Sequence, residues 1–81
     1  MRHRDRNEII AQILECYNRN KATQIKIMSD TYLTFYSAKE YLLLLLENGL
    51  VEYQEGERTF KTTEKGINFL SIYQNFSLTS L

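Results

Sequence analysis

The side chains best suited to nucleophilic or metal chemistry are scarce in this sequence. It contains one cysteine, Cys16, and one histidine, His3. Nucleophilic catalysis needs a base held beside the nucleophile, and a zinc site needs several cysteine or histidine ligands. The ten acidic residues are scattered and the three glycines form no phosphate-binding loop. We therefore expect no catalytic residue, no metal ion, no cofactor and no enzymatic activity, and we expect Cys16 to be a small packing residue.

Basic side chains that can contact phosphate gather toward both ends of the sequence. The attraction of lysine and arginine for nucleic acid grows with the number of phosphates that they neutralise. The chain has ten basic and ten acidic residues, which disfavours strong nonspecific binding. Residues 27–57 contain six acidic residues and a single basic one, Lys39, so the basic excess lies on either side of that stretch. A nucleic-acid surface must therefore combine the two basic ends, or the partner is not nucleic acid.

Three helices are predicted in the first part of the chain, over residues 5–18, 23–30 and 34–48. Apolar residues recur there at spacings of three and four, as on one face of a helix. Asp5, Thr23 and Thr34 are suited to be N-caps, and Gly49 is suited to end the third helix. The core stripe of the third helix is expected to consist of Phe35, Ala38, Leu42, Leu45 and Leu46.

The remaining residues predict a hairpin and a fourth helix. Polarity alternates over residues 50–61 on both sides of a three-residue turn, Glu55 to Glu57, and this pattern is typical of a β-hairpin. Residues 63–76 predict a helix capped by Thr62 or Thr63. The 81 residues thus form a single, mainly α domain with a small β-hairpin. The second and third helices make a helix-turn-helix, the hairpin is its wing, and residues 1–5 are a flexible basic arm.

Three segments resemble the small archaeal winged helix-turn-helix proteins that are predicted transcriptional regulators. They are RNEII at residues 6–10, LLENGLVEY at residues 45–53 and RTFKTTEKG at residues 58–66. The resemblance runs from about residue 5 to about residue 71. It implies binding to double-stranded DNA, with the third helix in the major groove and the wing on the flanking backbone or minor groove. It also implies a homodimer built through the last helix.

The candidate DNA contacts lie on the third helix, the wing, the second helix and the arm. Serine, threonine and tyrosine hydroxyls can bond phosphates or bases, and a glutamate can accept a hydrogen bond from cytosine. On the third helix only Lys39 is basic, whereas the family tends to place lysine, arginine or glutamine there. The alternatives are an ordinary solvated surface and a local ion pair of Arg58 with Glu52, Glu55 or Glu57. The candidates are Thr34, Tyr36, Ser37, Lys39, Glu40, Arg58, Lys61, Lys26, Arg4 and Arg6.

Surplus apolar residues predict protein contacts. Leu44 is expected opposite the core and Leu43 to its side, so these two leucines offer a surface to a protein partner. This gives a second hypothesis, a winged-helix protein-interaction module with little or no DNA affinity. The last helix carries more apolar residues than one small core needs, and the alternative to a dimer is packing on the first helix. The expected dimer seam comprises Phe69, Ile72, Tyr73 and Phe76, joined by Ile9 and Ile13.

The sequence also predicts where the protein resides. No apolar run approaches the roughly 18 residues that a membrane-spanning helix needs. The first residues are charged and lack the apolar stretch of a secretory signal. A single cysteine fits a reducing compartment. We therefore expect a cytoplasmic protein with no membrane partner.

Overall fold

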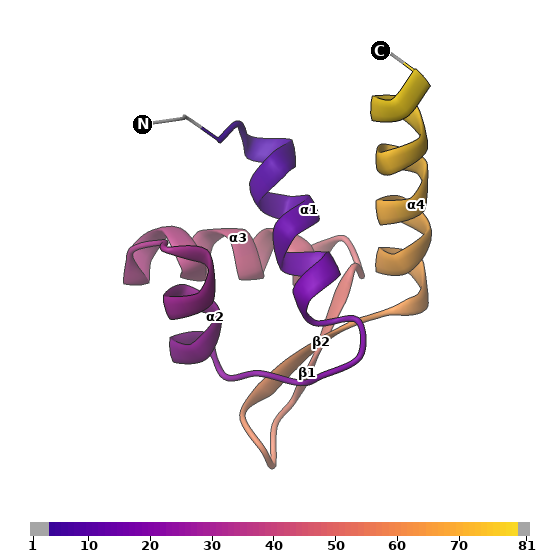
Figure 1. The fold of residues 1–81 in the computed structure, drawn as a ribbon. Coiled ribbons are helices and arrows are strands. Elements are labelled where there is room, and N and C mark those ends of the chain that lie inside the picture. Colours follow the sequence, from indigo (N-terminus) through magenta and orange to yellow (C-terminus); the bar gives the residue numbers. More distant parts are fainter. Residues whose placement is uncertain (1–3, 80–81) are drawn as a thin grey trace.

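Three helices, a hairpin and a fourth helix follow one another along the chain (Figure 1). The computed structural model describes the backbone of residues 4–79 and the side chains of residues 4–75. The elements are α1 (Arg6–Cys16), α2 (Gln24–Thr31), α3 (Phe35–Glu47), β1 (Val51–Gln54), β2 (Thr59–Thr62) and α4 (Glu64–Thr79). In Figure 1 the hairpin points away from the chain ends, and α4 stands beside α1. The order confirms the predicted fold class, a mainly helical winged helix-turn-helix.

Each helix begins at a side-chain cap that the sequence contains. Asp5 accepts a hydrogen bond from the Glu8 N–H at 2.8 Å. Thr23 and Thr34 act in the same way for α2 and α3, at 3.2 and 3.1 Å. Thr63 accepts from a backbone N–H of the first turn of α4 at 3.1 Å, so the cap is Thr63 and not Thr62. These oxygens satisfy backbone donors that have no partner within their helix.

The core lies where α1 crosses α2, α3 and the base of the hairpin. Its fully buried side chains come from three helices. Thr62 of β2 adds a buried polar link, because its hydroxyl donates to the Leu14 carbonyl at 2.8 Å and its N–H to the Tyr17 carbonyl at 2.9 Å. The hairpin is therefore attached to α1 by hydrogen bonds as well as by packing. The largest of the fully buried apolar side chains are Ile13, Leu14, Ile27, Leu42 and Leu45.

Three side chains lie elsewhere than the sequence predicts. Phe35 is expected in the core but is 51% exposed, because it stands at the very start of α3, at the edge of the stripe that Ala38 defines. Leu44 is expected opposite the core but is half-buried against it, and Leu43 is the exposed leucine. Cys16 is exposed at the end of α1 rather than packed inside. Partial burial and the nearby Asp30 raise the pKa of its thiol, so it is not an activated nucleophile.

The wing differs from the prediction in its turn. Gln54 pairs with Thr59, so the turn has four residues, Glu55 to Arg58, and Arg58 does not belong to a strand. Arg58 has a φ of 57°, and its N–H donates to the Gln54 carbonyl at 2.7 Å. This left-handed residue closes the turn, a conformation that usually favours glycine.

A third segment pairs with the wing, which the sequence did not predict. Ala22, just before α2, exchanges two backbone hydrogen bonds with Phe60 of β2, at 3.1 and 2.7 Å. The bridge places the start of α2 directly beside the second strand. The turn between α2 and α3 is likewise closed by a left-handed residue, Tyr32, at a φ of 57°.

A hydrogen-bonded carboxylate joins α1 to α2 and gives the first prediction. The Tyr17 hydroxyl donates to Asp30 at 2.8 Å, and the Lys26 ammonium donates to the same carboxylate at 3.1 Å. The hydrogen bond from Tyr17, followed by that from Lys26, lowers the pKa of Asp30. Burial and the bond to Asp30 raise the pKa of Tyr17. A carboxyl group whose pKa is lower in the folded state stabilises the fold at pH values above its pKa in the unfolded chain. This stabilisation is lost as the pH falls through the pKa of the folded state.

Replacing Tyr17 with phenylalanine is therefore expected to raise the pKa of Asp30 toward its ordinary value. The acid side of the stability profile should then begin to fall at a higher pH than in the wild type. NMR titration of the Asp30 carboxyl and melting temperatures between pH 2 and pH 6 measure both effects. Tyr36→Phe is the matched control, because Tyr36 is largely exposed and contacts no carboxylate among the interactions of the described residues. An unchanged Asp30 titration in Tyr17→Phe would contradict the assignment.

Candidate nucleic-acid interface

The outer face of α3 carries most of the side chains that the sequence suggests for DNA contact. Thr34, Tyr36, Lys39 and Glu40 are exposed or partly exposed, and Ser37 is half-buried. Ala38, Leu42 and Leu45 turn toward the core on the other side of the helix. The thirteen residues of α3 span about 20 Å. An α-helix of this kind fits into a major groove about 12 Å wide.

The first turns of α1 approach one end of this face. Arg6 lines a polar hollow of about 260 Å³ together with Ser37, Glu40 and Tyr41. The structure thus brings an arginine from the N-terminal segment to the side chains of α3.

Two residues of the predicted flexible arm, Arg4 and Asp5, are engaged with α1. Arg4 donates to the Gln12 side-chain oxygen at 2.6 Å and is half-buried, so it lies along α1. Asp5 is the cap of that helix and not part of a flexible arm. Residues 1–3 lie outside the described residues. Among the described residues of this segment, Arg6 is the arginine that remains exposed to an outside partner.

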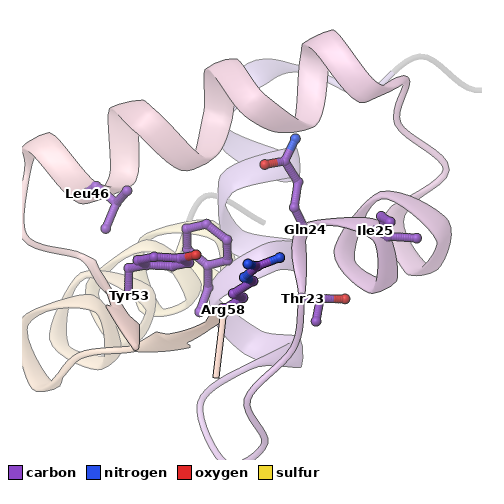
Figure 2. Close-up of a pocket in the computed structure, with 7 residues that line it drawn as sticks. Thr23, Gln24, Ile25, Leu46, Tyr53 and Arg58 are labelled. Atoms are coloured by element: carbon purple, nitrogen blue, oxygen red, sulfur yellow. The ribbon is translucent and has the colours of Figure 1, made fainter. Parts of the chain in front are cut away.

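The wing approaches the other end of α3. Arg58 lines an open groove of about 480 Å³ with residues from the start of α2 and the end of α3 (Figure 2). Lys61 is half-buried on β2, opposite Glu52 in the strand register. Lys26 is occupied by its ion pair with Asp30 at 3.1 Å. Of the three cations predicted on α2 and the wing, Arg58 is the best placed for an outside anion.

The acidic tip of the wing is paired in a way that sequence reasoning missed. Lys21 lies 3.0 Å from Glu57, and its hydrogen bond lowers the pKa of that carboxyl. The sequence suggested that Glu57 could pair with Arg58 instead. Arg58 forms no ion pair within the part of the chain that the structure describes. The two residues of the observed pair are 36 positions apart, so only the fold reveals it.

More apolar side chains are exposed around α3 than the two leucines that the sequence analysis predicted there. Each is substantially exposed on α2, the following turn, α3 or the wing. Leu43 lies between Glu40 and Glu47 along α3, and all three residues are exposed. This face is therefore of mixed character, with the cations Arg6, Lys39 and Arg58 lying among exposed apolar groups. The exposed apolar residues of this region are Ile25, Tyr32, Phe35, Tyr36, Leu43 and Tyr53.

Some of the residues that the sequence predicts for a dimer seam lie exposed on α4. Ile72 is 69% exposed and lines a hollow of about 360 Å³ with Asn7, Phe69 and Tyr73. Ile9 and Ile13, which the sequence predicts to join this seam, are buried in the core of their own chain. The side chain of Phe76 lies outside the described residues.

Two other kinds of site are not found among the described residues. No group of three or more histidine, cysteine, aspartate and glutamate residues in this part of the chain is arranged to hold a metal ion. Within the same residues, no helix combines the length and the apolar character needed to cross a membrane.

Comparison with known proteins agrees with the geometry. No curated protein matches the chain. A family model described as a winged helix-turn-helix matches residues 3–80, almost the whole sequence. The matched region contains α1 through α4, including the hairpin that follows α3. The chain belongs to this winged helix-turn-helix family.

Proposed function

We propose that the chain binds double-stranded DNA and regulates transcription, with α3 in the major groove and the wing on the flanking backbone or minor groove. The observation that carries this proposal is the placement of cations along α3. Arg6 lies at its N-terminal half, Lys39 on its outer face and Arg58 beside its C-terminal half. A partner that lies along the helix would meet all three, and phosphates are the natural counterions.

The polar side chains of α3 would then contact the bases. Tyr36 is 76% exposed and Glu40 is also exposed, so both can reach into a groove. The Thr34 oxygen already accepts a hydrogen bond from the Ser37 N–H, which leaves its O–H as a donor to DNA. Lys26 and Lys61 have secondary roles, because the first is ion-paired and the second is half-buried.

A second copy would pair through α4. Phe69 and Ile72 are both exposed on that helix, and burying them against the same face of another chain removes apolar surface from water. A two-fold arrangement would present two copies of α3 to half-sites about 34–36 Å apart. The dimer thereby doubles the number of phosphates that the protein neutralises.

Titration of the purified chain with double-stranded DNA over a range of salt concentrations tests this function. With about six phosphates neutralised per dimer, affinity should fall about 1,000-fold between 50 mM and 200 mM salt. Lys39→Gln and Arg58→Gln should each make the slope of log affinity against log salt shallower by about 1 for every phosphate that is no longer neutralised. Arg19→Gln is the charge-matched control, since Arg19 lies exposed between α1 and α2. No binding at low salt, or salt-independent binding, would contradict the proposal.

A protein-interaction module is the second candidate function. The observation that favours it is Leu43, which is 49% exposed and has acidic residues three and four positions away in the sequence. A recognition surface for DNA gains nothing from an exposed leucine between carboxylates, whereas a surface for a protein partner does. DNA binding that is absent at low salt, together with a protein complex that Leu43→Glu abolishes, would favour this function over the first.

A further inference from the structure

The groove between the start of α2, the end of α3 and the wing has the dimensions of a small-molecule site. Its volume is about 480 Å³, within the range of about 300–1,000 Å³ that is usual for such sites. It is a shallow, widely open groove, and in Figure 2 α3 runs above the side chains that line it. The residues that line it are Thr23, Gln24, Ile25, Leu46, Tyr53, Arg58 and Phe60.

The walls of this groove are apolar and partly flat. The rings of Tyr53 and Phe60 lie 4.8 Å apart and form one wall from the two strands. Ile25 and Leu46 contribute aliphatic groups from α2 and α3. Tyr53 and Ile25 are both substantially exposed, so a planar apolar molecule could cover them without displacing a packed side chain.

One polar group in the groove, the Arg58 guanidinium, has no ion-pair partner among the described residues and defines what such a molecule must carry. The Arg58 guanidinium forms no ion pair with any described residue, and Figure 2 shows it lying between Tyr53 and the start of α2. The Nε2 atom of Gln24 is buried and has no hydrogen-bond partner among the described residues. An atom with almost no exposed surface cannot reach a molecule in the groove, and Figure 2 shows this amide turned toward α3, so Gln24 does not supply a ligand contact. With Arg58 as the available cation, the groove suits a single negative charge and not a polyphosphate.

We propose that this groove binds a small aromatic carboxylate. Its ring lies against Tyr53, Ile25 and Leu46, and its carboxylate is held by Arg58, whose planar guanidinium matches a carboxylate in two parallel hydrogen bonds. Because Arg58 is also a proposed DNA contact, the ligand and DNA compete for it. Only that competition rests on the proposed function, whereas binding in the groove does not.

Titration of isotope-labelled chain with 1-naphthoate, followed by the backbone amide signals, tests the proposal. Saturable shifts are expected at Ile25, Leu46 and Tyr53. The neutral analogue 1-naphthamide should bind at least about tenfold more weakly, because it lacks the charge that Arg58 recognises. Arg58→Gln should abolish the difference between the two probes, Arg58→Lys should restore part of it, and Arg19→Gln should leave it intact. The amide spectrum of each variant reports whether the fold is retained.

Three outcomes would overturn the inference. They are no saturable shift at millimolar 1-naphthoate, equal affinity for the two probes in the wild type, and shifts centred on Phe69 and Ile72, the other apolar hollow.

A competition experiment with DNA separates the two proposals. If the chain binds no DNA but binds 1-naphthoate in the groove, the proposed function fails while this inference stands. If DNA binds and 1-naphthoate does not reach the groove, the reverse holds.

Discussion

Replacement of Gly66 by alanine is expected to destabilise the fold by about 1–3 kcal/mol or more, even though alanine is the better helix former. Gly66 lies in the first turn of α4, where an added Cβ would stand 2.2 Å from the Leu50 carbonyl oxygen and 2.7 Å from a methyl group of Thr62. The Leu50 carbonyl already accepts a hydrogen bond from the Thr63 N–H at 3.0 Å. Relief therefore requires α4 to move away from the base of the hairpin.

Urea unfolding of the two proteins measures this difference. Gly56→Ala is the matched control, because an added Cβ on the wing turn would meet no atom within 4 Å. That control should be neutral or more stable by about 0.4–1 kcal/mol, since alanine restricts the unfolded chain. A Gly66→Ala protein as stable as the wild type would show that α4 does not rest on the Leu50 carbonyl.

Replacement of Leu45 by alanine should cost about 2–5 kcal/mol of unfolding free energy, the usual range for a buried leucine. Leu45 has no exposed surface and lies within the core cluster. Leu43, two residues earlier on the same helix, is 49% exposed, so the same change there should cost less than about 1 kcal/mol. Thermal melts of both variants suffice, because 1 kcal/mol shifts the melting temperature of a domain of this size by about 4–8 °C.

The comparison of Leu45 with Leu43 also tests the orientation of α3. The orientation of α3 about its own axis buries Leu45 and at the same time exposes Lys39 and Glu40. If the two alanine variants lost stability equally, α3 would be rotated about its axis. The proposed DNA contacts would then have to be assigned again.

The elements of this fold follow from local signals in the sequence, which explains why they could be predicted. Asp5, Thr23 and Thr34 each cap the helix that follows, and capping depends only on residues within one turn. The change from helical to alternating spacing after Gly49 locates the wing. Phe35 and Leu44 lie elsewhere than predicted because periodicity gives the direction of a side chain but not which neighbouring element covers it.

The candidate site depends on contacts between distant residues and was only partly predictable. Arg58, Lys39 and Arg6 could be proposed from their charge, but nothing local places Arg6 beside Glu40 or pairs Lys21 with Glu57. The same limit applies to Ile9 and Ile13. Their spacing indicates an apolar face, and only the packing of the chain shows that this face is already covered.

The bridge between Ala22 and Phe60 couples the wing to the helix-turn-helix mechanically. A hairpin whose strands pair only with each other can tilt relative to the rest of the fold. Here the second strand has neighbours on both sides, β1 and the segment before α2. Any tilt of the wing must therefore either break those two backbone hydrogen bonds or carry the start of α2 with it. A change in the position of the wing is thus passed on to the start of α2.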